Sequence, residues 1–90
     1  MTEFIFLSAI NPEYGCALKT GDGGGGTEVK VGLQTGDECV KECINRKKTD
    51  PTINGVTMID NGAGCWCEKS MSNIDTADTM YKTCYLLGKC

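Results

Sequence analysis

The chain has 90 residues, a formal net charge of −3 and no histidine. A chain of this length forms one domain, which we take as residues 1–90, and it buries too little apolar surface to be stable by a wide margin from packing alone. The acidic balance disfavours a nucleic-acid-binding protein, because neutralising phosphates requires a concentrated basic surface.

Disulfide bonds are the expected source of the missing stability. Seven cysteines approach the density of a disulfide scaffold, and twelve glycines with few aromatic residues favour a loop-rich body. Because disulfides persist in oxidising compartments, we expect a secreted, extracellular protein. The first residues do not resemble a signal peptide, since Glu3 is acidic and the apolar run 4–7 is too short for a leader or a membrane span. Either a leader has been removed or the protein is intracellular, and the cysteine spacing favours the first.

The first predicted element in chain order is a strand over residues 4–10, which ends at the turn signal Asn11-Pro12. Residues 21–26, with the sequence GDGGGG, are predicted to form a flexible loop. They satisfy the GxGxxG pattern of dinucleotide-binding proteins, but that motif requires a helix directly after it. Residues 27–33 are instead predicted to be a half-buried strand, because three apolar residues alternate with polar or small ones: Val29, Val31 and Leu33.

A helix is predicted to begin at the capping box Thr35-Gly36-Asp37-Glu38, where the threonine hydroxyl accepts a backbone N–H and the glutamate reaches back. It should end near residues 46–48, before Asp50-Pro51 forces an extended or turn conformation. The side of this helix that should face the core carries Cys39, Val40, Cys43 and Ile44.

Two antiparallel strands are predicted after the helix, over residues 56–59 and 65–68. The turn signals Asn54-Gly55 and Asn61-Gly62 bracket the first strand, and the second signal joins the two. After a polar stretch, residues 80–87 are rich in aromatic, β-branched and aliphatic side chains and predict a last strand.

Four cysteines have spacings that match between a helix and a strand. Cys39 and Cys43 should lie on one face of the helix about 6 Å apart, and Cys65 and Cys67 on one face of a strand about 6.6 Å apart. The helix can therefore lie on the sheet with two neighbouring bridges. An antiparallel helix and strand would give Cys39–Cys67 with Cys43–Cys65, which we prefer, and a parallel arrangement would give the crossed pairs. The same four thiolates could instead hold a structural zinc ion.

The remaining three cysteines leave their pairing open. A bridge between Cys16 and Cys84 would tie the two ends of the domain together and leave Cys90 for an intermolecular bond, as in a disulfide-linked homodimer, or for a thiol partner. Alternatively, Cys90 pairs with Cys16 and Cys84 is a buried free thiol, or truncation has left Cys90 without its partner.

An opening cysteine is followed by the helix sequence ECVKEC, the segments NGVT and GCWCE, and a closing TCYL. This pattern, over residues 16–85, resembles the PAN/apple class of extracellular modules and, more distantly, the WSC modules. The resemblance implies an α+β fold in which one helix packs across a curled antiparallel sheet, with a third bridge from Cys16 to Cys84. It also implies a non-enzymatic module. WSC modules carry further C-terminal cysteines that are absent here, and the glycine-rich segment belongs to neither pattern.

Catalysis lacks its usual groups. Without histidine, a cysteine or serine nucleophile has no ordinary base, and no carboxylate pair stands out among the acidic residues. We therefore expect no enzyme, no cofactor and no metal.

Trp66 lies between two bridged cysteines, so its ring should point to the sheet face opposite the helix. It either packs under the N-terminal strand or a loop, or forms an open face with Tyr81 or Tyr85 that stacks on a sugar or anchors a protein. We therefore expect a secreted module that binds protein or carbohydrate in adhesion or extracellular matrix. The alternatives are a secreted toxin or protease inhibitor that presents residues 21–26, and an intracellular zinc module with four cysteine ligands.

Overall fold

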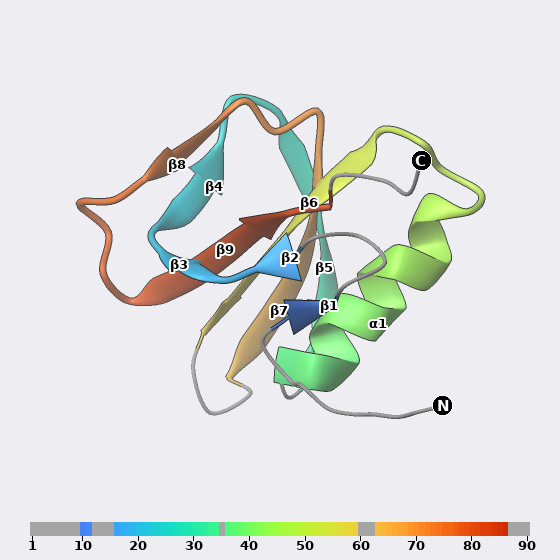
Figure 1. Ribbon diagram of the computed structural model, residues 1–90, viewed down its shortest axis with the longest axis horizontal. Coiled ribbons are helices and arrows are strands. Elements are labelled where there is room, and N and C mark those ends of the chain that lie inside the picture. Colours follow the sequence, from blue (N-terminus) through green and yellow to red (C-terminus); the bar gives the residue numbers. More distant parts are fainter. Residues whose placement is uncertain (1–9, 12–15, 35, 60–62, 87–90) are drawn as a thin grey trace.

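A computed structural model describes residues 10–11, 16–34, 36–59 and 63–86. One helix, α1 (Gly36–Lys47), packs across one face of a curled antiparallel sheet whose strand order is β3-β9-β6-β7-β5 (Figure 1). These strands are β3 (Lys19–Thr20), β5 (Thr27–Gly32), β6 (Ile53–Ile59), β7 (Gly64–Lys69) and β9 (Tyr81–Tyr85). The predicted class, a small disulfide-rich α+β domain, is confirmed.

Two short antiparallel ribbons complete the described fold. The first pairs β1 (Ile10–Asn11) with β2 (Cys16–Ala17), and the second pairs β4 (Asp22–Gly24) with β8 (Asn73–Asp75). In Figure 1 the second ribbon lies on the side of the sheet away from α1. The predicted first strand, residues 4–10, falls almost entirely outside the described residues.

The helix has the bounds and the buried face that the sequence predicts. Acidic residues occupy its first turn and basic residues its last, which complements the helix dipole. Glu42 accepts a hydrogen bond from Arg46 at 2.8 Å, one turn along the exposed side. Thr35 of the predicted cap lies outside the described residues. The buried side chains of α1 are Cys39, Val40, Cys43 and Ile44.

The core lies between α1 and the sheet. Apolar residues of β6 and the bridged cysteines of β7 face the helix. Leu86, which directly follows β9, is also buried in this core. The buried core residues are Cys16, Cys39, Val40, Cys43, Ile44, Ile53, Val56, Met58, Cys65, Cys67, Cys84 and Leu86. Six of these twelve are cysteines, so covalent bonds replace much of the aliphatic packing that a longer chain would use.

Two strand boundaries differ from the sequence prediction. Asn54-Gly55 is part of β6 and not a turn, because the register shifts between Ile53 and Gly55 and the bulge absorbs the extra residue. The Asn54 side-chain amide makes two hydrogen bonds with the Met71 backbone. Its oxygen accepts from the Met71 N–H at 2.7 Å, and its nitrogen donates to the Met71 carbonyl at 2.9 Å. Leu33 is 74% exposed, because a second register shift in β5 ends the alternation before it.

The prediction of a flexible loop at residues 21–26 is wrong. This segment contains β4, which pairs with β8 along its whole length. Glycine is needed there for close approach: a Cβ at Gly23 would lie 2.9 Å from both the Thr57 hydroxyl and the Glu68 carboxyl carbon. The glycines therefore serve contact between β4 and the sheet.

The preferred pairing of the helix cysteines is also wrong. The bridges are Cys39–Cys65 and Cys43–Cys67, with Cα–Cα distances of 5.7 and 5.4 Å. The reason is strand direction. β6 is antiparallel to β7, and Figure 1 shows α1 running against β6 after a short connection, so α1 and β7 run the same way. The first cysteine of the helix therefore meets the first cysteine of the strand.

The third bridge joins Cys16 in β2 to Cys84 in β9, with a Cα–Cα distance of 5.2 Å and a sequence separation of 68. This is the pairing that the family resemblance implies, and Cys84 is not a free thiol. Cys90 lies outside the described residues.

Removing the Cys16–Cys84 bridge should destabilise the domain strongly. In the chain-entropy view, a loop of this length contributes about 4 kcal/mol to the free energy of unfolding. We expect the double variant Cys16→Ala/Cys84→Ala to lose about that amount in urea unfolding, measured in a Cys90→Ser background so that a free thiol cannot rearrange the other bridges. An unchanged free energy of unfolding would contradict the bridge.

The pairing of the helix cysteines can be read by peptide mapping. Cleavage at Lys41 separates Cys39 from Cys43, and cleavage after Trp66 separates Cys65 from Cys67. We expect mass spectrometry of the unreduced peptides, after digestion with free thiols blocked, to join the Cys39 peptide to the Cys65 peptide. A Cys39–Cys67 peptide would overturn the observed connectivity.

Candidate functional site

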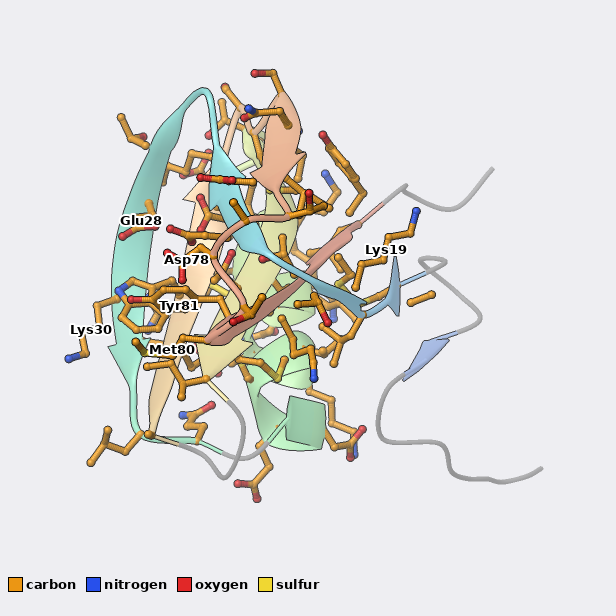
Figure 2. The ribbon with its side chains drawn as sticks, turned by 90° about the vertical axis from the view of Figure 1, so that its left-hand side faces the viewer. Lys19, Glu28, Lys30, Asp78, Met80 and Tyr81 are labelled. Atoms are coloured by element: carbon orange, nitrogen blue, oxygen red, sulfur yellow. A yellow bond between two sulfur atoms is a disulfide. The ribbon has the colours of Figure 1, made fainter. Side chains whose placement is uncertain are left out.

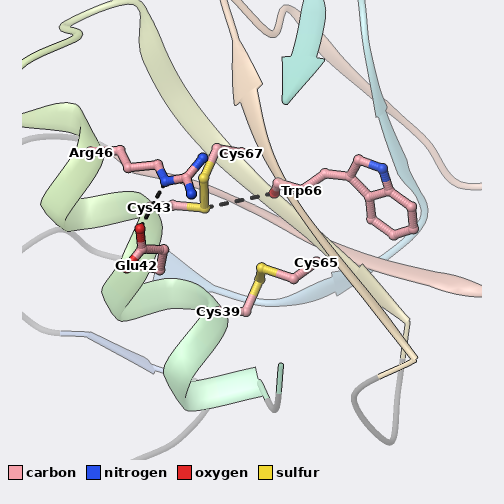
Figure 3. Close-up of a disulfide and its surroundings, with 7 residues drawn as sticks. All are labelled: Cys39, Glu42, Cys43, Arg46, Cys65, Trp66 and Cys67. Atoms are coloured by element: carbon pink, nitrogen blue, oxygen red, sulfur yellow. Dashed lines mark hydrogen bonds and ion pairs between the residues drawn. A yellow bond between two sulfur atoms is a disulfide. The ribbon is translucent and has the colours of Figure 1, made fainter. Parts of the chain in front are cut away.

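The sheet face opposite α1, called here the outer face, carries the candidate site. Cys65 and Cys67 point to the helix, so Trp66 between them points away, and Figure 3 shows its indole ring on the far side of β7 from α1. Cross-strand partners share a face of a sheet. The register therefore places one row across five strands on the outer face: Lys30, Trp66, Thr57, Thr83 and Lys19.

The β4–β8 ribbon covers one half of the outer face. The Thr83 hydroxyl donates a hydrogen bond to the Gly21 carbonyl at 2.7 Å, and the Thr57 and Thr83 hydroxyls lie 2.9 Å apart. Both threonines are buried. Met71 fills the space beneath the ribbon beside Gly23. This half of the face is therefore interior and presents no threonine side chain to a partner.

The other half of the outer face carries Trp66, which is half-buried. The Tyr81 ring meets it edge to face, with centroids 5.8 Å apart and an interplanar angle of 74°. The Lys30 ammonium lies 5.7 Å from the indole centroid, within range of a cation–π interaction. Gly64 leaves space for the Trp66 ring, because a Cβ at this position would lie only 2.5 Å from it. We call Trp66, Tyr81 and Lys30 the aromatic patch.

Two large apolar side chains close in sequence to the aromatic patch are exposed. Met80 directly precedes Tyr81 and is 59% exposed. Leu33, three residues after Lys30 and just beyond β5, is 74% exposed. Figure 2 shows Met80 and Tyr81 together at the sheet edge, with Lys30 extending from β5. Large exposed apolar groups beside a tryptophan are typical of a surface that contacts a partner.

Of the three aromatic residues that the sequence singled out, the structure brings two together. Trp66 and Tyr81 are in contact, whereas Tyr85 lies four residues further along β9, about 13 Å away in an extended strand. Buried Thr83 separates the two tyrosines along the strand. Tyr85 is therefore not part of the aromatic patch.

Sequence reasoning missed a group of three carboxylates, here called the acidic cluster: Asp22, Glu28 and Glu68. They come from β4, β5 and β7, and each offers an oxygen within 4.8 Å of the others. Glu28 and Glu68 are cross-strand partners, a pairing visible once the strands are aligned. Asp22 joins them only because β4 folds onto the sheet, which no local pattern indicates.

Burial dominates the electrostatics of Glu68, which is only 3% exposed. Burial is the largest cause that raises the pKa of Glu68, a hydrogen bond with Thr57 lowers it, and the neighbouring Glu28 and Asp22 raise it, so that the pKa is about 7. The pKa of Asp22 is also raised, first by burial and then by Glu28. Among the described residues, the Oε2 atom of Glu68 has no hydrogen-bond partner. The cluster therefore brings three carboxyl groups together, one of which has a buried oxygen without a partner among the described residues.

The structure uses the four cysteines of the hypothetical zinc site as two disulfides. A separate cavity of about 240 Å³ lies near the C-terminal end of α1, beside the ion pair of Lys69 with Asp50 at 2.9 Å. Hydrogen bonds from Thr52, followed by the contact with Lys69, lower the pKa of Asp50 to about 2. This cavity is lined by Val29, Arg46, Thr49, Asp50, Ile53 and Lys69.

Comparison with known proteins adds no identity: no protein family, no characterised protein and no solved structure matches the chain. Within the part of the chain that the structure describes, no helix has the length and apolar character needed to cross a bilayer.

The pKa of Glu68 predicts how stability depends on pH. The folded protein holds this proton more tightly than the unfolded chain, with a pKa of about 7 against 4.5. Its contribution is therefore fully present below pH 4.5 and is lost as pH rises through about 7. The raised pKa of Asp22 acts in the same direction. Asp50 acts oppositely, but only in acid, as pH falls from 3.8 through about 2.

We expect the free energy of unfolding, from urea titrations in metal-free buffer, to fall by on the order of 2 kcal/mol between about pH 4.5 and 7.5. Glu68→Gln cannot ionise and should remove most of this decline. Glu42→Gln, on α1, is the matched control and should keep it. A wild-type profile that is flat over this range would show that Glu68 is not perturbed.

Proposed function

We propose that this chain is an extracellular, non-enzymatic interaction module of PAN/apple-like type that binds a protein partner through the aromatic patch. The observation that carries the proposal is the division of the outer face. The β4–β8 ribbon buries one half, including Thr57 and Thr83, while Trp66 and its neighbours stay accessible at the other. A half-buried tryptophan among exposed apolar side chains is a typical anchor of a protein interface.

The geometry of Trp66 favours a protein over a sugar. Stacking on a sugar ring needs a free, flat aromatic face, whereas the Tyr81 ring and the Lys30 ammonium both lie close to this indole. Met80, next to Tyr81 in sequence, adds an exposed and adaptable apolar side chain. Apolar and aromatic groups with a charged rim match the composition of protein interfaces.

The extracellular part of the proposal rests on the disulfides. The three bridges lie in the core, and all six bridged cysteines are buried. Such bonds persist in oxidising compartments. The helix, the curled sheet and a bridge between the first and last parts of the domain also agree with the architecture that the PAN/apple resemblance implies. The adhesion or matrix role is part of the proposal.

A non-enzymatic role is supported by the chemistry of the described side chains. The chain has no histidine, and the six described cysteines are bridged and so unavailable as nucleophiles. Glu68 has the perturbed pKa that a general acid would need, but its carboxyl group is buried beneath β4 and only 3% of the residue is exposed. The toxin or inhibitor alternative loses its main support, because residues 21–26 are held in the β4–β8 ribbon.

Binding measurements on variants of the aromatic patch and of Tyr85, at the other end of β9, test the proposal. Wild type would be screened against a panel of purified cell-surface and matrix proteins, and in parallel against a glycan array. We expect a protein ligand whose affinity falls at least about tenfold in Trp66→Ala and in Tyr81→Ala, the effect of removing an interface anchor. Tyr85→Ala, at the far end of β9, is the matched control and should bind as wild type does.

A protein ligand that binds Trp66→Ala and wild type equally would move the interface away from the aromatic patch. Glycan binding that depends on Trp66, without a protein ligand, would replace the protein proposal with a lectin function. Circular dichroism of each variant separates loss of binding from loss of fold.

A further inference from the structure

The acidic cluster contains a buried oxygen without a partner. Glu68 is only 3% exposed, and its Oε2 atom has no hydrogen-bond partner among the described residues. The hydrogen bond between Thr57 and this carboxyl group leaves the Oε2 atom without a partner. A buried carboxylate oxygen that is left unpaired is costly, so this position favours a ligand that carries positive charge.

The spacing of the three carboxylates fits one cation. Their ligand oxygens all lie within 4.8 Å of one another. Three oxygens this close can approach one ion after small side-chain movements, and calcium tolerates the irregular geometry of such a site, whereas magnesium demands a near-ideal octahedron. The donors are all hard oxygens, which select calcium over zinc.

The charges around the cluster point the same way. Two further carboxylates act on Asp22: Asp75 is its partner across the β4–β8 ribbon, and Asp78 interacts with it electrostatically. The nearest lysines in sequence are directed elsewhere: Lys30 lies over the Trp66 ring and Lys69 pairs with Asp50. Figure 2 shows Glu28 and Asp78 on the same side of the molecule. When they are ionised, these carboxylates repel one another, and a cation between them would remove that repulsion.

We propose that Asp22, Glu28 and Glu68 form a binding site for a calcium ion. The exposed side chain of Glu28 leaves the site open to solvent, so water can complete the coordination of the ion. The proposal does not depend on the partner-binding function, because none of the three ligands belongs to the aromatic patch.

Such an ion would connect β4 to the two strands beneath it. Asp22 belongs to the ribbon, while Glu28 and Glu68 belong to the main sheet. Calcium would thus hold the ribbon over the buried threonines and remove the carboxylate repulsion that opposes this position. Loss of calcium should weaken the ribbon first and leave the disulfide-bonded helix in place.

Isothermal titration with calcium chloride in chelator-treated buffer at about pH 7.5 tests the site. We expect one ion per chain with a dissociation constant of about 10⁻⁴–10⁻³ M, the range of extracellular modules. Asp22→Asn and Glu68→Gln should each weaken binding at least about tenfold, because each removes a charged ligand. Glu42→Gln removes the same charge from α1 and should bind calcium as wild type does. Magnesium chloride is the second probe and should bind more weakly.

Terbium luminescence gives a second readout that locates the ion. Trp66 is the sole tryptophan of the chain and lies two residues from Glu68 on the outer face. Excitation of this indole should sensitise the emission of bound terbium. Added calcium should displace terbium and so reduce this emission. The signal should fall in Asp22→Asn, which replaces a half-buried side chain with one of equal size and should leave the fold intact.

The proposal would be overturned if calcium binding released no measurable heat in the titration and terbium showed no sensitised emission. Equal calcium affinity in wild type, Asp22→Asn and Glu68→Gln would overturn it too, because the ion would then sit elsewhere. Loss of partner binding in Trp66→Ala with calcium binding retained would support the two proposals separately.

Discussion

The fold depends on one constraint: two disulfides hold alternate residues of β7 against α1. Because side chains of a strand alternate between its faces, fixing Cys65 and Cys67 on the helix side fixes Trp66 and Glu68 on the other. Both candidate sites follow from this. Trp66 anchors the aromatic patch, and Glu68 is the buried member of the acidic cluster. A shift of β7 by one residue would exchange the two faces and remove both sites together.

Much of the fold could be predicted from local patterns. The capping box and the apolar spacing predicted the helix, and the cysteine spacings predicted the helix-to-strand contact. The pairing within that contact failed because direction was not followed along the chain. A helix joined to β6 by a short connection runs against it, and β7 runs against β6, so α1 and β7 must be parallel. The relative direction of helix and strand could have been deduced from the order of the elements and the length of their connections. The spacing within each cysteine pair is the same in either direction, so it does not distinguish the two pairings.

The parts that could not be predicted depend on contacts distant in sequence. A run of glycines usually indicates a mobile segment. The neighbouring sequence does not show that position 23 requires glycine because Thr57 and Glu68 pack against it. Burial of Glu68 depends on the same β4–β8 ribbon, so its raised pKa and its place in the acidic cluster were equally hidden. Tyr85 resembled Tyr81 in sequence, but the ribbon covers the strand between them, and only one end of β9 reaches Trp66.

The Cys16–Cys84 bridge has a mechanical consequence. It joins β2 to β9 across 68 positions of the sequence. A pull applied to the chain outside these two residues passes through a covalent bond and bypasses the segment between them. The sheet, the helix and both candidate sites therefore carry little of that tension. A domain tied in this way can transmit force between its neighbours while its binding surface keeps its shape, and reduction of a single buried bond would convert it from an inextensible link into an extensible one.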